Sequence, residues 1–261
     1  MQAKPATCRT AASTQDLRIA SLYQAHFATM YPQRRIRSFV LRAGRVTAAQ
    51  ERALAELWPV YGLDYSGDRV DLDHAFGKSP GRGAAPRCLE IGFGAGEVIG
   101  ALAEANPHND YLGIEVHRSG VGRLLLHTAD AKLTNVRIMC HDAVEVLKAS
   151  IDDQSFDEIL IFFPDPWHKK RHHKRRLIDP AFVDLLADKM RGCAVLRLAT
   201  DWQNYAEQML SVLSKNPRLE SLSSDAAYVE RPAFRPATRF ERRGARLGHG
   251  VWDLAYRKRD R

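Results

Sequence analysis

Two features are missing from this sequence, long apolar runs and paired cysteines, and each absence excludes a class of protein. No apolar stretch reaches the roughly 18–20 residues that a membrane-spanning helix needs, and the start of the chain has no apolar signal core. The four cysteines, Cys8, Cys88, Cys140 and Cys193, lack both C-x-x-C and metal-site spacing. The sequence therefore predicts a cytoplasmic protein with reduced thiols, without a membrane anchor or a disulfide framework.

Acidic residues are outnumbered by basic ones. Asp and Glu number 31 against 39 Lys and Arg in 261 residues, which gives a formal net charge of +8. This excess favours an anionic partner such as a nucleic acid. The hydrophobic content of 45% and the charged content of 27% are those of a globular protein, and the length suffices for one large domain with its own core.

Composition divides the chain into three expected segments. Residues 1–32 are expected to form a mobile tail, and residues 87–261 the main domain. Between them, residues 33–86 hold an arginine-rich arm, a helix with Thr47 as its N-cap, and from residue 58 a connecting loop rich in Gly, Pro and Asp. The arm either covers part of the core or contacts phosphates, and the sequence leaves both interpretations open.

Short apolar segments alternate with helical patterns from Arg87 onward. The expected strands are RCLEIGF (87–93), DYLGIEV (110–116), VRIMCHD (136–142), DEILIFF (157–163) and CAVLRLATD (193–201). Two later segments, LESLS (219–223) and VWDLAYRKR (251–259), are further strand candidates. The alternation predicts an α/β fold with a doubly wound, mostly parallel, Rossmann-like sheet and helices on both faces.

The first expected strand runs into a glycine-rich turn that holds Glu90, Gly92, Gly94 and Gly96. Glycines at a strand-to-helix turn let the backbone approach a ligand closely. The E-x-G-x-G-x-G spacing differs from the G-x-G-x-x-G that places a pyrophosphate at a helix N-terminus. A carboxylate beside the turn would repel a pyrophosphate but suits a cation. A purely structural glycine turn is common, but with a strand before it and a helix after it the motif favours a nucleotide-type cofactor. S-adenosylmethionine, which carries an ammonium and a sulfonium, suits the carboxylate.

The next two strands also end in acids. Glu115 lies where an acid typically accepts hydrogen bonds from ribose hydroxyls, or else it caps the following helix. Asp142 either caps the helix that follows or accepts a hydrogen bond from the adenine amino group. Because ligands bind at the carboxyl ends of the strands in such sheets, acids at three successive strand ends favour a cofactor site there.

The stretch ILIFFPDPWHKKRHHKRR, residues 159–176, joins an apolar run to a dense group of cations. The run indicates a strand buried on both faces, which Pro164 and Pro166 bring to an end. Asp165 is then expected at the ligand edge, as is Asp201 in the ATDW that ends the fifth strand. The alternative for each aspartate is a turn or capping role. The cations that follow would attract a polyanion to this edge.

Carboxylates without an evident Ser–His or Cys–His pair suit methyl transfer from a sulfonium, which needs an in-line nucleophile and little covalent help. A ring nitrogen with a free lone pair needs no general base, but positive charge develops on the ring as it is methylated. A carboxylate at the Watson–Crick edge would hold the ring and stabilise its developing charge. The electrostatic energy is at most ~4 kcal/mol for charges ~4 Å apart at an effective dielectric of ~20. Guanine fits, because it has two N–H donor groups on that edge and N7 on the other.

Three histidines, His168, His172 and His173, lie among the cations of residues 159–176. A metal site is disfavoured because no nearby acid or Cys completes it. A solvated basic face is the usual explanation of such a run, whereas phosphate contact is favoured next to a site. A second cationic loop surrounds residues 238–241. Its Phe could stack on a base and its Glu could form hydrogen bonds with one, as in RNA-binding proteins. Alternatively, the loop is structural and its Phe is buried.

These segments together resemble the tRNA (guanine-N7-)-methyltransferases of the bacterial single-chain type. The resemblance extends from about Arg34 to Tyr256 and is carried by RSFVLRAGR, LEIGFGAG, GIEVHRSGVG, CHDAVEVL, FFPDPWHKKRHHKRR, ATDW, RPATRFERRG and RLGHGVWDL. The block from PDPW to KRR is highly specific. The resemblance implies that residues 87–261 form an S-adenosylmethionine-dependent methyltransferase domain. Such a domain converts a guanine of the tRNA variable loop to 7-methylguanosine.

The resemblance also implies roles for particular residues. Those expected to contact the cofactor, with Asp165 also at the catalytic position, are Glu90, Glu115, Asp142 and Asp165. Those expected to engage the target guanine are Lys169, Asp201, Thr238, Arg239, Phe240 and Glu241. Relatives often have Lys where this chain has Arg239, which keeps the charge. The expected partner is tRNA, with no metal and no obligate protein partner.

Three alternatives stay open at this point. An NAD-dependent oxidoreductase on a similar sheet would explain Glu115 but neither Glu90 nor Asp142, and its hydride-site His or Tyr constellation is not evident. A non-catalytic tRNA-binding module would bind RNA with a steep salt dependence but would not bind the cofactor. An amino-group methyltransferase would use a Pro-Pro-aromatic turn, but here Asp165 lies between the two prolines.

Overall fold

The structure is a computed structural model that describes residues 37–40, 45–77, 85–225, 227–236, 241 and 250–260. Contacts divide the chain into two compact units, residues 1–37 and 38–261, and every element below belongs to the second. The expected tail, residues 1–32, and most of the arginine-rich arm lie outside the described residues. The segment boundaries expected at residues 33 and 87 therefore stay predictions.

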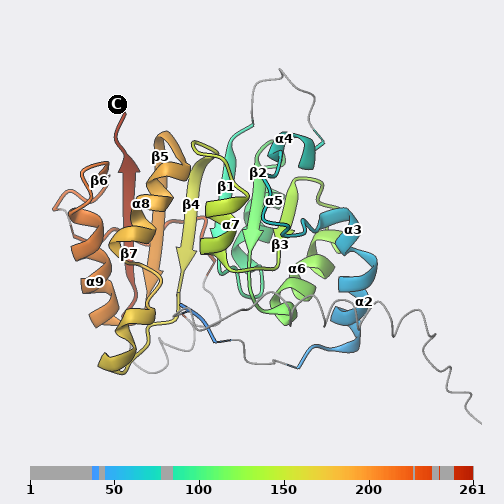
Figure 1. Cartoon of the computed structure of the whole chain (residues 1–261), viewed down its shortest axis with the longest axis horizontal. Coiled ribbons are helices and arrows are strands. Elements are labelled where there is room, and N and C mark those ends of the chain that lie inside the picture. The colour runs from blue at the N-terminus through green and yellow to red at the C-terminus, as the bar shows by residue number, and fades with distance from the viewer. Residues whose placement is uncertain are drawn as a thin grey trace, which may run out of the picture. The chain divides into compact units, whose positions relative to one another are not determined.

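Seven strands form one mixed sheet in the order β3-β2-β1-β4-β5-β7-β6 (Figure 1). They are β1 (Arg87–Ile91), β2 (Asp110–Ile114), β3 (Val136–Met139), β4 (Phe156–Phe162), β5 (Met190–Thr200), β6 (Leu219–Ser221) and β7 (Trp252–Lys258). Strands β1 to β5 pair in parallel, whereas β7 is antiparallel to both β5 and β6. The doubly wound, mostly parallel sheet and its two late strands are confirmed.

Helices lie on both faces of the sheet (Figure 1). They are α2 (Ala48–Glu56), α3 (Trp58–Tyr61), α4 (Leu72–Ala75), α5 (Glu97–Ala105), α6 (Arg118–Asp130), α7 (Ala143–Ala149), α8 (Pro180–Lys189) and α9 (Gln203–Ser214), with the 3-10 helix η1 (Lys170–Arg175). The segment expected as a connecting loop from residue 58 also contains two short helices, α3 and α4. Pro59 in the first turn of α3 and Asp71 as the N-cap of α4 start helices here.

Strand β4 is buried on both faces, as its apolar run predicted. Ile159 and Ile161 pack into a core with side chains of α7, α8 and α9, whereas Leu160 and Phe162 pack into a second core with side chains of α5 and α6. Successive side chains of a strand point to opposite faces, so one strand serves both cores. The end of β4 is thereby fixed, and with it the turn that follows.

Helix α2 begins where the sequence predicts. Thr47 Oγ1 accepts a hydrogen bond from Gln50 N at 3.3 Å, and Gln50 Oε1 accepts one from Thr47 N at 2.9 Å, which makes a capping box. Gln50 Nε2 also donates to Ser119 O at 3.1 Å. A Cβ added at Gly122 would lie 2.8 Å from Gln50 Cβ. Helix α2 is therefore packed closely on α6, beside the start of that helix.

The three described cysteines, Cys88, Cys140 and Cys193, are free thiols, as predicted. Burial raises the pKa of Cys140 to about 12, so this thiol next to the end of β3 stays protonated and unreactive. None of the described helices combines the length and the apolar character that crossing a membrane requires.

Candidate active site at the carboxyl edge of the sheet

The strand register brings the predicted acids to one edge of the sheet. Ile91 pairs with Ile114, and Ile114 with Met139, so the chain leaves β1, β2 and β3 side by side. Strand β4 lies on the other side of β1, with Leu160 opposite Glu90. At ~4.8 Å between neighbouring strands, the four strand ends span only ~15 Å. Figure 1 shows these ends along the lower edge of the sheet.

Glu90 is a buried carboxyl group in β1, only 3% exposed. Gly96, the N-cap of α5, has no side chain to accept from the helix, and the Glu90 carboxyl accepts a hydrogen bond from Ile99 N–H instead. Its other oxygen, Oε2, has no hydrogen-bond partner in the described part of the chain. Burial raises the pKa of Glu90 to about 8; the Ile99 hydrogen bond opposes this shift and the charge of Glu115 adds to it. A buried acid with an unused oxygen at a ligand edge suits a cation.

The glycine-rich turn leaves open space beside β1. Gly92, Gly94 and Gly96 have φ angles of 72°, 56° and 78°, which residues with a Cβ rarely adopt. A Cβ added at Gly92 or Gly94 would meet no atom within 4 Å. The turn therefore presents its backbone to a space that a ligand can enter, as the sequence predicted.

The position of this turn depends on Gly120 in α6. A Cβ at Gly120 would lie 2.1 Å from Gly94 O, so Gly120→Ala must displace the turn. We expect this variant to bind S-adenosylmethionine about tenfold more weakly or worse, which is ~1.4 kcal/mol, as measured by isothermal titration calorimetry. Gly192→Ala is the control, because its Cβ would meet only the flexible Asp260 side chain, 2.6 Å away. Unchanged affinity in a normally folded Gly120→Ala would contradict this account of the turn.

Glu115 joins the glycine-rich turn to the start of α6. Its Oε2 accepts from Gly94 N at 2.8 Å, and its Oε1 accepts from Val116 N at 2.7 Å and from His117 N at 3.0 Å. The structure therefore shows the local backbone contacts that the helix-capping alternative implied. A carboxylate has about four acceptor positions, so Oε2 keeps one, and contact with a ribose hydroxyl stays a prediction.

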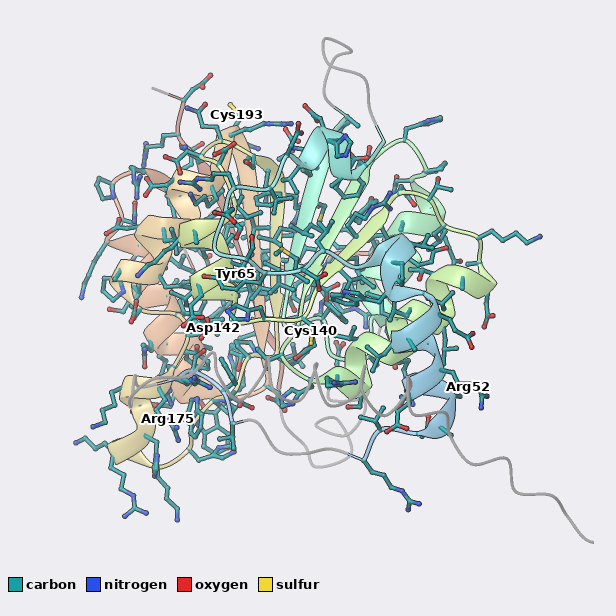
Figure 2. The ribbon with its side chains drawn as sticks, turned by 45° about the vertical axis from the view of Figure 1, so that its right-hand side comes forward. Arg52, Tyr65, Cys140, Asp142, Arg175 and Cys193 are labelled. Carbon is teal, nitrogen blue, oxygen red and sulfur yellow. The ribbon has the colours of Figure 1, made fainter. Side chains whose placement is uncertain are left out.

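Asp142 caps α7 at the end of β3. Its Oδ1 accepts from Val144 N at 2.8 Å, and burial raises the pKa of its carboxyl group. In the preceding residue, His141 Nε2 lies 2.7 Å from Glu145 Oε2, and the His141 ring stacks on Tyr65 with 3.8 Å between ring centroids. Figure 2 shows Tyr65 and Asp142 in the same region. The capping role is observed, the adenine contact stays a prediction, and the aromatic stack has no signal in the sequence.

The turn after β4 holds two strained residues. Phe163 and Trp167, which flank the PDP tripeptide, have positive φ angles of 53° and 48°, a conformation that costs ~1–3 kcal/mol each in a non-glycine residue. Phe163 N donates to Ala199 O at 2.8 Å, and Trp167 Nε1 donates to Ser38 O at 2.9 Å. Asp165 is exposed at the tip. Strain of this kind is concentrated at functional sites, which supports the predicted role of this turn.

Arg176 fixes the same turn to α9, although in the sequence it is one cation in a run. It is 3% exposed. Its Nε donates to Pro166 O at 2.9 Å, and its terminal nitrogens donate to Gln208 Oε1 at 2.7 Å and Asn204 Oδ1 at 2.9 Å. The guanidinium also lies 4.7 Å from the centroid of the Tyr205 ring. The sequence does not distinguish Arg176 from its neighbours, because its burial depends on contacts with a distant helix.

The remaining cations of this stretch form an exposed surface. We call it the η1 surface; its members are Lys169, Lys170, Arg171 and Lys174. Next to it, the guanidinium of Arg175 lies 4.3 Å from the centroid of the Trp167 ring. Figure 2 shows Arg175 on the side of the molecule where the strands end, and Cys193 at the opposite end of the sheet. The searched residues contain no group of three or more His, Cys, Asp or Glu that could hold a metal ion.

The residues predicted to engage the target base are placed only in part. Asp201 is half-buried just after β5. The next residue, Trp202, contacts His168 edge to face, with 4.2 Å between ring centroids. The turns after β4 and β5 therefore lie side by side, which brings Asp201 into the same region as Lys169.

Glu241 is already paired within the protein. Its carboxylate lies 2.9 Å from a terminal nitrogen of Arg235 and 3.5 Å from one of Arg231. Thr238, Arg239 and Phe240 lie outside the described residues. Contact between residues 238–241 and a guanine stays a prediction, and the pairing with Arg235 was not foreseen.

Known proteins resemble this chain over most of its length. A family model described as "Putative methyltransferase" matches residues 84–254. The chain is 53% identical over 227 residues to a tRNA (guanine-N(7)-)-methyltransferase of Methylobacillus flagellatus, which covers 87% of this chain and 93% of that protein. It is 56% identical over 226 residues to the protein of the same name from Burkholderia vietnamiensis, with coverages of 87% and 86%. The chain belongs to the tRNA (guanine-N(7)-)-methyltransferase family.

A solved structure supports the fold independently. The 16S rRNA methyltransferase KamB aligns with a TM-score of 0.51 at 14% sequence identity, covering 68% of this chain and 89% of that one. At this identity the likeness concerns the fold alone. Membership of the tRNA (guanine-N(7)-)-methyltransferase family is inconsistent with the alternative of an NAD-dependent oxidoreductase.

Enzymes of the tRNA (guanine-N(7)-)-methyltransferase family use S-adenosylmethionine, and the residues of this edge fit that cofactor. The unpartnered oxygen of buried Glu90 suits a cation. The open space at Gly92 and Gly94 admits a ligand beside the turn. Glu115 keeps an acceptor position next to it. The assignment of individual contacts to these residues stays a prediction.

Proposed function

We propose that this chain transfers the methyl group of S-adenosylmethionine to N7 of a guanine in the variable loop of tRNA, giving 7-methylguanosine. The observation that carries the proposal is the arrangement along one sheet edge of buried Glu90, the exposed Asp165 turn and the η1 surface. The first suits a cationic cofactor, and the other two suit an anionic substrate that contains a base. The names of the relatives support tRNA as the substrate and N7 of guanine as the target.

On the cofactor side, each acid has its own role in the proposal. Glu90 offsets the positive charge of the cofactor, Glu115 accepts from its ribose hydroxyls, and Asp142 accepts from its adenine amino group. The glycine-rich turn lets the backbone approach the ligand. When bound, the cofactor supplies a methyl group on a sulfonium, which makes that carbon electrophilic.

On the substrate side, Asp165 and Asp201 hold the Watson–Crick edge of the guanine, and Lys169 with the η1 surface contacts the RNA backbone. Residues 238–241 complete the base site. The N7 lone pair is free, so no general base is needed. The N7–methyl bond forms as the sulfur–methyl bond breaks, and the positive charge passes to the guanine, where the Asp165 carboxylate stabilises it.

The proposal is tested with methyl-labelled S-adenosylmethionine and tRNA isolated from cells that lack 7-methylguanosine. We expect the purified chain to incorporate about one methyl group per acceptor tRNA, because one base is methylated, at a rate that falls steeply with salt. The same tRNA already carrying 7-methylguanosine is the control and should accept none. Cofactor or tRNA binding without any incorporation would favour a non-catalytic binding module instead.

We place the reaction in the cytoplasm, where tRNA is available and thiols such as Cys88 stay reduced. We expect the single chain to act without an obligate protein partner, so the purified protein alone should show the full activity.

A further inference from the structure

Arg235 is a fully buried cation that contacts three parts of the carboxyl edge. Its side chain is 0% exposed. One terminal nitrogen donates to Glu241 Oε2 at 2.9 Å, and the other donates to both carboxylate oxygens of Asp253 in β7, at 2.8 and 3.1 Å. The guanidinium also lies 5.3 Å from the ring centroids of Phe162 and Phe163. One side chain thus connects β7 of the sheet, the turn after β4 and Glu241.

Asp253 determines where this cation lies relative to the proposed base site. It pairs with Ala199 of β5, and Ala199 pairs with Phe162 of β4. Both β4 and β5 end within a few residues of this row, at the turns that hold Asp165 and Asp201. Arg235 therefore lies next to the carboxyl ends of β4 and β5, where the two turns proposed to hold the guanine begin.

Arg235 forms a closer and better buried ion pair with the Glu241 carboxylate than Arg231 does. Arg231 is 3.5 Å from the Glu241 carboxylate and its side chain is 48% exposed, and such exposed pairs hold a side chain only weakly. The pair with Arg235 is buried and charge-assisted, which makes it stronger. A planar guanidinium donates to two carboxylates through separate nitrogens and lies flat against aromatic rings, a geometry that the compact ammonium of Lys does not reproduce.

We infer that Arg235 is a positioning residue that holds the Glu241 carboxylate at the carboxyl edge, in place for the target guanine. The inference rests on the proposed function. Arg235 acts through Glu241 rather than on the base, because both of its terminal nitrogens donate to carboxylates of the protein. It also gives a physical reason for the contact between Arg235 and Asp253 of β7.

Arg87 provides a matched control. Its side chain is 6% exposed and is paired with Asp73 at 2.6 Å and with Asp110 at 3.9 Å. Like Arg235, it has an Nε without a hydrogen-bond partner among the described residues. Arg87 is the first residue of β1 and therefore lies at the amino ends of the parallel strands, opposite the carboxyl edge. Arg87→Lys therefore removes a comparable buried guanidinium far from Glu241.

The test compares methyl transfer to tRNA and melting temperature in Arg235→Lys, Glu241→Gln, the double variant and Arg87→Lys. We expect Arg235→Lys and Arg87→Lys both to lower the melting temperature. Only Arg235→Lys should lower kcat/KM for tRNA, by about tenfold or more, as expected when a charge-assisted hydrogen bond is lost. The double variant should be no worse than Glu241→Gln alone, because both substitutions remove the same interaction. A merely structural role would not produce this non-additivity.

Two results would overturn the inference. One is an Arg235→Lys variant with the same kcat/KM as Arg87→Lys, and the other is a double variant in which the two losses multiply. If Arg235→Lys does not fold, Asp253→Asn replaces it in the same cycle, since it keeps the side-chain size and loosens Arg235 from β7; the same non-additivity is expected. A wild-type protein that methylates no tRNA would instead overturn the proposed function, and the same assay shows this directly.

Discussion

Asp165→Ala is expected to slow methyl transfer to tRNA by up to ~10³-fold with little change in melting temperature. The side chain is exposed at the tip of its turn, so its removal costs little packing. Positive charge develops on the guanine during transfer, and a carboxylate ~4 Å away at an effective dielectric of ~20 offsets at most ~4 kcal/mol of it. Single-turnover rates at saturating cofactor and tRNA measure this effect, because they report the chemical step.

Asp165→Asn separates the charge of this residue from its shape. The amide keeps the size of the side chain, so we expect tRNA binding to be retained while most of the rate is lost. Asp130→Ala is the control, because it removes an exposed acid at the far end of α6 and should behave as wild type. A near-normal single-turnover rate for Asp165→Asn would contradict electrostatic stabilisation by this carboxylate.

Cofactor affinity is expected to rise about tenfold between pH 6 and pH 7, because Glu90 must lose a proton before it can offset a cation. The pKa of Glu90 in the ligand-free protein is raised to about 8, mainly by burial. Binding at pH 7 should therefore release nearly one proton. The ammonium of the cofactor stays largely charged over this range, since α-amino groups titrate at ~7.7–8.0. Calorimetric titrations in buffers of different ionisation enthalpy count the protons directly.

Glu90→Gln is the matched variant for this prediction. The amide oxygen can still accept from Ile99 N–H, but the group no longer titrates. Its affinity for S-adenosylmethionine should be low and nearly independent of pH, and any pH dependence that remains reports other groups. Equal proton release by wild type and Glu90→Gln would show that Glu90 is not the group that titrates.

The same carboxyl group also affects the stability of the ligand-free protein. Its pKa is raised from 4.5 to about 8 on folding, so its stabilising contribution is fully present below about pH 4.5 and is lost as the pH rises to about 8. Because Gln does not ionise, Glu90→Gln removes this loss of stability at higher pH. We expect the variant to melt at a higher temperature than wild type at pH 8, with a smaller difference at pH 5, as measured by calorimetry without cofactor.

The sequence predicts the sheet well because the relevant signals are local. The apolar run of β4 and the prolines after it predict a strand buried on both faces that ends near Phe163, and the structure confirms this. Thr47 as N-cap likewise predicts the start of α2. The acids at the ends of β1, β2 and β3 meet at one edge because parallel pairing requires it.

The details of the site depend on contacts between distant segments, which the sequence does not show. Arg176 and Arg235 are ordinary members of cationic runs, and only the fold buries one against α9 and the other against Asp253. The double role of Glu115, which joins two loops through three backbone hydrogen bonds, depends in the same way on where β1 places Gly94.

The most direct test of the central claim is mass analysis of nucleosides from tRNA that the purified chain has treated with methyl-labelled S-adenosylmethionine. The account predicts that the label appears in 7-methylguanosine and that Asp165→Ala nearly abolishes it. Label in an N2- or N6-methylated nucleoside would contradict transfer to a ring nitrogen, and the absence of label from tRNA would contradict the proposed function as a whole.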